Sequence, residues 1–90
     1  MARFDIQDST LACADIAGVV NAEVLFHMGI LAAAGRNGQV RHVEAHKWFN
    51  LAAMKGIGEA ADYRQEIAAQ MTKDQVREAL KGAREWLKLN

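Results

Sequence analysis

The stretch that decides the fold runs from Gly29 to Ala60 and reads GILAAAGRNGQVRHVEAHKWFNLAAMKGIGEA. Alanines and two aromatic residues recur in it at helical spacing, i, i+3, i+4 and i+7, namely Ala45, Trp48, Phe49 and Ala52. These residues share one side of a helix, with Ala53 at its edge. Two large rings framed by methyl-sized neighbours predict a close contact with a preceding helix, on which Gly29 leaves room for a ring. We expect Trp48 to be the ring buried there.

This pattern resembles the Sel-one-like repeat family, whose members are related to the tetratricopeptide repeats. The family combines a glycine-rich turn with an alanine, a tryptophan followed by an aromatic residue, an alanine pair, a glycine and a final alanine. Here the resemblance is carried by Met28, Gly29, Gly35, Gly38, Val40, Ala45, Trp48, Phe49, Ala52, Ala53, Gly56 and Ala60. Ala32 and Arg41 depart from the family, which has an aromatic and an acidic residue there. The resemblance covers one repeat and implies a helix-turn-helix unit used for protein-protein contact.

The composition agrees with an all-α fold of one small domain. The chain has 90 residues, no proline and a single cysteine, and its 11 Lys and Arg residues balance its 11 Asp and Glu residues. The absence of proline suits helices, and a zero net charge does not attract nucleic acid or anionic lipid over a long range. The first twenty residues lack a secretion signal, and no apolar run approaches the roughly 20 residues of a membrane span. We therefore expect a soluble cytoplasmic protein that binds neither nucleic acid nor membranes.

Stop and start signals divide the chain into four predicted helices. The first covers residues 21–34 and ends at Gly35, and the second covers 42–55 and ends at Gly56. A third begins at residue 57 or 58 and runs to about 70. Thr72 and Gln75 then form a predicted capping box that opens a fourth helix, to residue 89. Residues 19–60 thus form the repeat, residues 61–90 form capping helices, and residues 1–18 are expected to hold a short helix closing near Gly18.

The helix predicted over residues 21–34 is apolar on two sides. One side, which carries Val24 and Met28, is expected to face the tryptophan. Either the other helices bury both sides, or the second side meets a partner or a second copy of the chain. In the resembling family the first helix of each pair lines the binding surface, which favours contact. The candidate partner-binding residues are therefore Phe26 and Ile30, with Glu23 and His27 at the rim.

Few residues are candidates for chemistry. His42 and His46 are four apart, a metal-ligand spacing, but no third ligand is evident. Cys13 has no histidine in local register, and the glycines at 35 and 38 lack the lysine and hydroxyl residue of a phosphate loop. We expect no catalytic residue, no metal and no cofactor, and hence no enzyme.

The fourth predicted helix carries a basic stripe, formed by Arg77, Lys81, Arg84 and Lys88. Acidic residues three or four positions away can pair with it, so a solvated, salt-bridged face is favoured over a phosphate-binding one. These acidic residues are Asp74, Glu78 and Glu85. Trp86 is either a core anchor or, where exposed, an interface hot spot, and the sequence leaves both readings open.

Together these patterns predict an all-α, tetratricopeptide-like helical hairpin with flanking capping helices. Its expected role is a protein-protein interaction module that acts as a small adaptor or regulator, and its expected partner is another protein. Two alternatives remain. One is a structural domain that associates only with itself as a homo-oligomer. The other is a nucleic-acid- or metal-binding regulator that uses the basic stripe or the histidine pair.

Overall fold

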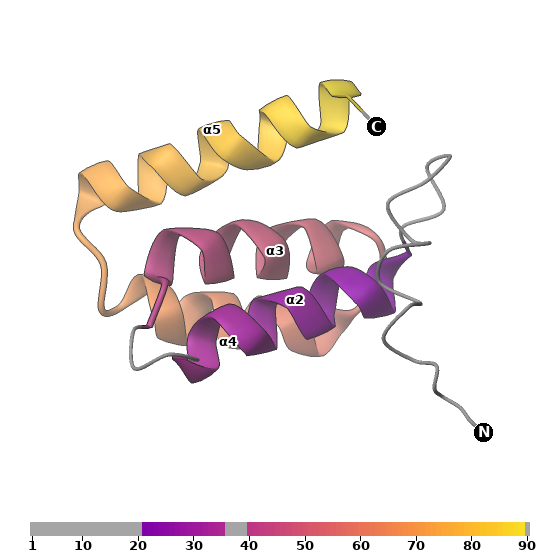
Figure 1. Ribbon diagram of the computed structural model, residues 1–90, viewed down its shortest axis with the longest axis horizontal. Helices are drawn as coiled ribbons and strands as arrows, with labels where there is room; N and C mark the ends of the chain where they lie inside the picture. The colour runs from indigo at the N-terminus through magenta and orange to yellow at the C-terminus, as the bar shows by residue number, and fades with distance from the viewer. Residues whose placement is uncertain (1–20, 36–39, 90) are drawn as a thin grey trace.

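The computed structural model describes residues 21–35 and 40–89, and these residues form an all-α arrangement (Figure 1). The helices are α2 (Ala22–Ala34), α3 (His42–Met54), α4 (Gly58–Ala68) and α5 (Lys73–Leu89). The predicted all-α class is confirmed, and the four predicted helices are present with ends that differ by a few residues. The helix predicted within residues 1–18, Cys13 and the turn at 36–38 lie outside the described residues.

Local signals explain where α2 begins and ends. The Asn21 side chain accepts a hydrogen bond from the Val24 amide at 2.9 Å, which caps the first turn. Gly35 has a φ of 73°, in the left-handed region where glycine carries no steric penalty. Beyond the turn, the Arg41 amide donates to the Ala32 carbonyl at 3.0 Å. This bond ties the start of α3 to the end of α2.

Two further signals set the limits of α3 and α5. Gly56 follows α3 with a φ of 113°, and the chain can therefore turn sharply into α4. The predicted capping box is confirmed, because the Gln75 amide donates to the Thr72 hydroxyl at 3.1 Å and the Thr72 amide donates to the Gln75 side-chain oxygen at 2.9 Å. It satisfies two backbone amides at the start of α5.

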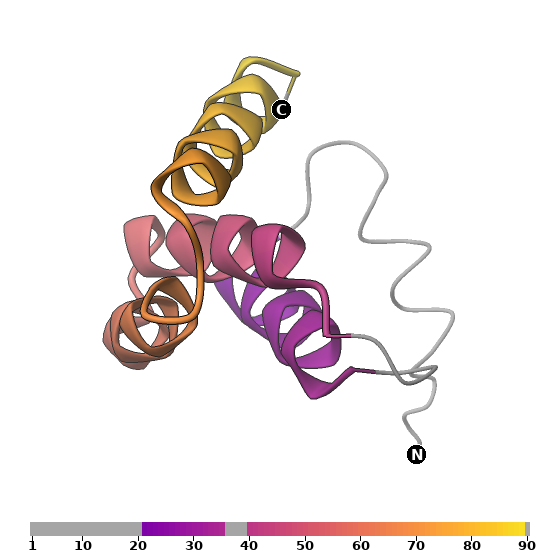
Figure 2. The ribbon, with the colours of Figure 1, turned by 90° about the vertical axis from the view of Figure 1, so that its left-hand side faces the viewer.

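Helix α3 lies at the centre of the molecule and contacts α2, α4 and α5. Successive helices run in alternating directions along the long axis (Figure 1). Seen from the side, α5 lies on one side of α3, while α2 and α4 lie on the other (Figure 2). The main contacts of α5 are therefore with α3. Among the described helices, none combines the length and apolar character needed to cross a membrane.

The core joins both sides of α3. The largest fully buried side chains are Leu25 of α2 together with Phe49 and Leu51 of α3. Phe49 packs where Gly29 has no side chain, since a Cβ at Gly29 would lie 2.6 Å from the Phe49 ring. Leu51 belongs to the same apolar cluster as Ala83 of α5. The close crossing predicted at Gly29 is thus present.

The ring in that crossing differs from the one expected. Trp48 is only half-buried, and it contacts Trp86 of α5 edge-on, with ring centroids 6.2 Å apart. Adjacent residues on a helix point about 100° apart, so Phe49 and Trp48 cannot both face Gly29. The expectation that Trp48 is buried against Gly29 is therefore wrong, and Phe49 takes that place.

Candidate partner-binding surface

The outer side of α2 presents two polar side chains to solvent. Glu23 and His27 are both exposed and lie one helical turn apart, as the sequence predicted for a polar rim. Phe26 and Ile30, the apolar members of the candidate surface, are half-buried. The four residues thus share one side of α2, with an apolar edge turned inward and a polar edge turned outward.

The two apolar sides of α2 pack differently from what the sequence predicted. Phe26 and Ile30, expected to be free for a partner, pack against the buried cluster. Val24 and Met28, expected to support the fold, are half-buried and are not among the residues that pack against that cluster. Leu25 instead anchors α2, with no exposed surface. A surface built on Phe26 therefore offers only part of that side chain.

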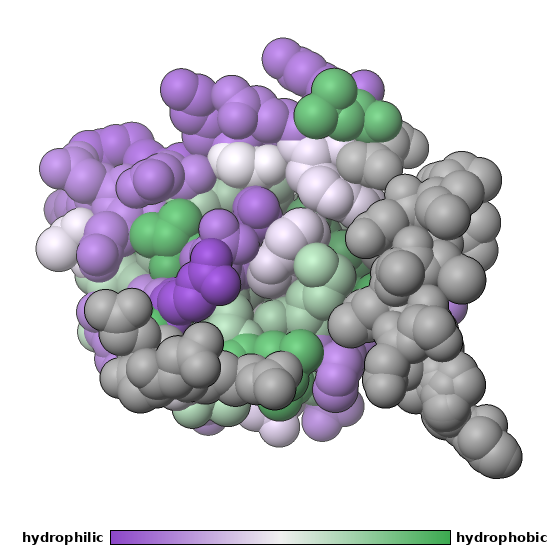
Figure 3. Space-filling model, viewed as in Figure 1, coloured by the Kyte–Doolittle hydropathy of each residue, from purple (hydrophilic) through white to green (hydrophobic). Residues whose placement is uncertain are grey.

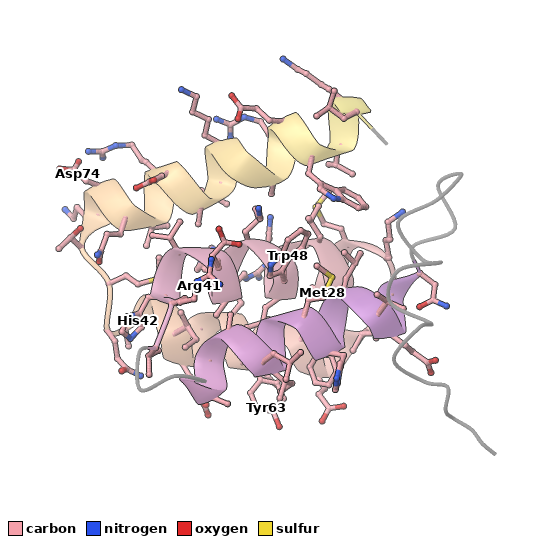
Figure 4. All side chains as sticks on the ribbon, viewed as in Figure 1. Met28, Arg41, His42, Trp48, Tyr63 and Asp74 are labelled. Atoms are coloured by element: carbon pink, nitrogen blue, oxygen red, sulfur yellow. The ribbon has the colours of Figure 1, made fainter. Side chains whose placement is uncertain are left out.

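Tyr63 of α4 completes this surface and is not among the binding residues predicted from the sequence. Its ring centroid lies 5.4 Å from that of Phe26 and 5.4 Å from that of Phe49, on which it stacks. Phe26 and Phe49 also contact each other at 5.8 Å. Tyr63 is 36% exposed, so the triad of rings reaches solvent. In Figure 4 its side chain lies at the edge of the molecule away from α5.

A sequence signal for Tyr63 existed. Ala60, Tyr63 and Ile67 stand at i, i+3 and i+7, which places the ring beside the buried side of α4. Ala60 and Ile67 are buried, and Tyr63 lies at the border of that side, next to α2. Ala60 ends the predicted repeat and Ile67 lies in the predicted capping helices, whereas Tyr63 between them was not predicted to bind a partner.

A polar cluster lies between α3 and α4. The Arg64 guanidinium donates a hydrogen bond to the Asn50 side-chain oxygen at 2.5 Å. His46, on the same helix as Asn50, is 4% exposed, and its Nδ1 atom has no hydrogen-bond partner among the described residues. Burial lowers the pKa of His46 below its ordinary value of 6.5, and the nearby Arg64 charge lowers it further. The histidine is therefore held neutral inside the molecule.

The other residues with chemical potential do not form a site. His42 is half-buried and His46 is buried one turn further along α3. Within residues 21–35 and 40–89, no group of three or more His, Cys, Asp or Glu side chains is arranged to hold a metal ion. An open hollow between α3 and α5 is lined mainly by charged residues of both signs, unlike the mostly apolar lining of small-molecule sites. The lining residues are Val43, Glu44, Lys47, Glu78, Lys81, Gly82 and Glu85.

The basic stripe of α5 faces solvent. Arg77, Lys81, Arg84 and Lys88 are all exposed, and hydrophilic side chains gather along α5 at the top of Figure 3. Of these four, only Arg77 forms an ion pair among the described residues, with Asp74. The salt-bridged face expected from sequence is thus only partly formed.

Trp86 packs at the edge of the buried cluster, so it is closer to a core anchor than to an exposed interface residue. It is half-buried against Trp48, which lies between α2 and α5 in Figure 4. The Lys47 ammonium lies 4.2 Å from the Trp48 ring centroid and covers part of it. The two tryptophans therefore connect α5 to α3, at the margin of the core.

Comparison of the chain with protein-family models, with curated proteins and with solved structures finds no match.

Proposed function

We propose that this chain is a protein-protein interaction module, acting as a small adaptor or regulator without catalysis. Its partner-binding surface consists of Glu23, Phe26, His27 and Ile30 of α2 together with Tyr63 of α4. We further propose that α2 and α3 form a tetratricopeptide-like hairpin of the Sel-one-like kind. In that reading α2 and α4 line the binding side, as the first helices of each pair do in the resembling family.

The observation that carries this proposal is the ring triad of Phe26, Phe49 and Tyr63. Phe49 anchors the triad in the core, and Tyr63 carries it to the surface. A large ring held by stacking loses little conformational freedom when a partner covers it, and tyrosine is among the residues that dominate binding energies. The exposed Glu23 and His27 supply the polar rim that surrounds such an anchor.

The test is an affinity pull-down from a cell lysate, in which the proteins retained by the wild type are compared with those retained by two variants. Tyr63→Ala removes the anchor, while Gln65→Ala changes an exposed residue on another side of the same helix. We expect Tyr63→Ala to lose most of the proteins that the wild type retains, and Gln65→Ala to retain them. Circular dichroism of both variants establishes that α4 is intact. Equal capture by all three proteins would exclude this surface.

A further inference from the structure

Helix α4 carries three acidic side chains on its outer side. Glu59, Asp62 and Glu66 stand at i, i+3 and i+7, and all three are exposed. None of them forms an ion pair with another described residue. The one cation of α4, Arg64, is turned toward α3, where it binds Asn50. This acidic stripe (Glu59, Asp62 and Glu66) is therefore not neutralised within its own helix.

Helix α5 carries the complementary set of charges. Lys81, Arg84 and Lys88, the part of the basic stripe beyond Arg77, also stand at i, i+3 and i+7. All three are exposed, and none forms an ion pair with another residue that the structure describes. The ends of each triplet are seven residue steps apart, or about 10 Å along a helix axis. The two triplets therefore match one to one when the two helices lie side by side and parallel. The pairs are then Glu59 with Lys81, Asp62 with Arg84 and Glu66 with Lys88.

Apolar residues beside the acidic stripe and beside the basic triplet also favour the parallel orientation of the two helices. On α4, Tyr63 lies on one flank of the acidic stripe, and on α5 the 39%-exposed Leu87 lies on the opposite flank of the basic triplet. In parallel helices that face each other, opposite flanks meet, as the e and g positions of a coiled coil do. The parallel match thus brings the Tyr63 ring next to Leu87. An antiparallel match would place Tyr63 beside Glu78 and Glu85 instead.

A single molecule cannot bring these two stripes together. Helices α4 and α5 run in opposite directions and lie on opposite sides of α3 (Figures 1 and 2). The parallel contact therefore requires α4 of one molecule and α5 of another. Because each molecule keeps one free stripe after one contact, the association is head-to-tail and open-ended.

We propose that a second copy of this chain is a partner of the module, and that it binds through the acidic stripe and Tyr63 on one copy and through Lys81, Arg84, Lys88 and Leu87 on the other. This inference rests on the proposed function, since it names an occupant for the side of the molecule that carries Tyr63. The contact is weak and salt-dependent, because exposed ion pairs contribute little each and are screened by added salt.

The test is sedimentation equilibrium of the full chain over a range of concentrations. At an ionic strength of about 0.01 M, where screening acts over about 30 Å, the weight-average mass rises above that of the monomer as concentration increases. At about 1 M, where screening acts over about 3 Å, it returns to the monomer value. A mass that stays monomeric in both buffers overturns the inference, and so does association that salt does not weaken.

Two neutralised variants test the direction of the contact. One carries Glu59→Gln, Asp62→Asn and Glu66→Gln, and the other carries Lys81→Gln, Arg84→Gln and Lys88→Gln. Each is monomeric alone, but an equal mixture forms a complex of two chains and nothing larger, because one intact stripe of each kind remains. Glu78→Gln, exposed on α5 outside the triplet, associates as the wild type does.

Association by either neutralised variant alone would contradict this arrangement, and so would a mixture that stays monomeric. The α5 variant leaves Glu23, Phe26, His27, Ile30 and Tyr63 unchanged. Its capture of other proteins therefore tests the proposed function separately. A chain that captures a partner through Tyr63 and yet remains monomeric retains the proposed function and loses only the self-association.

Discussion

Two neighbouring residues show how far a helical pattern determines packing. The spacing placed Trp48 and Phe49 on the same broad side of α3, and both belong to the apolar interior or its margin. It did not say which ring meets Gly29, because that depends on the angle at which α2 crosses α3. In the structure, Phe49 packs against Gly29, and Trp48 contacts Trp86 of α5 instead. A residue-level pattern therefore predicts burial more reliably than it predicts the contact partner.

We expect Gly29→Ala to destabilise the protein. The added methyl group would lie 2.6 Å from the Phe49 ring, which has to move, and overpacking of this kind costs about 1–3 kcal/mol. Alanine recovers up to about 1 kcal/mol through its higher helix propensity, so the net effect is a loss. Urea unfolding of Gly29→Ala, Phe49→Leu and the double variant measures it.

We expect the stability losses of Gly29→Ala and Phe49→Leu not to add, because the smaller leucine makes room for the added methyl group. The double variant should be more stable than the sum of the two single losses predicts. Additive losses would mean that the ring does not occupy the space above Gly29. Trp48→Ala serves as the comparison, and we expect it to cost less than Phe49→Ala, since Trp48 is half-buried.

The buried His46 should make stability depend on pH. Its folded-state pKa is lowered from 6.5, so the unfolded chain binds the proton more readily than the folded one. The free energy of unfolding is therefore highest above pH 6.5 and falls as the pH drops below that value, until the folded-state pKa is reached. Arg64 on α4 is the charge that opposes protonation, while its neighbour Asn50 is neutral.

The measurement is urea unfolding at several pH values between about 5 and 8, the range in which histidine titrates. His46→Leu removes the titrating group and should flatten the profile, whereas His27→Leu changes an exposed histidine and should preserve it. A profile that is equally steep in His46→Leu and in the wild type would assign the pH dependence to other groups.

At the scale of the helices, end signals were the most reliable guide. Gly35, Gly56 and the Thr72–Gln75 box each marked an end that the structure shows at or beside the predicted residue. These signals act through backbone bonds within a few residues, so the local sequence contains all the information needed. The sides of α2 were harder to assign, because Val24 and Phe26 are both apolar and only the packing of the neighbouring helices distinguishes their environments.

We expect the capping box to hold the start of α5 in place. Thr72→Ala removes a side-chain bond to the Gln75 amide and should cost about 1 kcal/mol of stability. Thr72→Ser keeps a hydroxyl that can accept the same bond and should cost much less. Hydrogen exchange at the first turn of α5 would locate the effect. Equal losses for the alanine and serine variants would show that the hydroxyl bond contributes nothing.

At the scale of the whole molecule, the position of α5 is what the sequence did not predict. One side of α5 is apolar and is buried through Ala79 and Ala83, but a single apolar side does not specify the surface beneath it. The structure places α5 against α3, opposite α2 and α4 (Figure 2). The contact between Phe26 and Tyr63 was not predicted either. It joins α2 to α4, and these two residues are far apart in sequence. Assembly of the helices is thus a non-local property of this chain.

Because α3 is central and contacts α5, we expect the fold to need α5. Leu51 is two residues from Phe49 and so points to another side of α3. It lies one helical turn beyond Lys47, whose side chain packs against Gly82 of α5, and it is fully buried. Removing α5 exposes Leu51 and Trp48, at a cost of about 1.5–3 kcal/mol for each large apolar side chain uncovered. A domain of this size has about 5–15 kcal/mol in total, so we expect a chain ending at Met71 to lose its cooperative thermal transition.

Point variants separate that effect from the loss of chain length. Ala83→Glu puts an unpaired charge at a buried position of α5 and should abolish the transition, as the truncation does. Glu85→Gln changes an exposed residue two positions away and should melt as the wild type does. Circular dichroism during heating measures all three variants. If the truncated chain melts cooperatively at the wild-type temperature, α2, α3 and α4 form a complete domain, and α5 is an accessory that the core does not need.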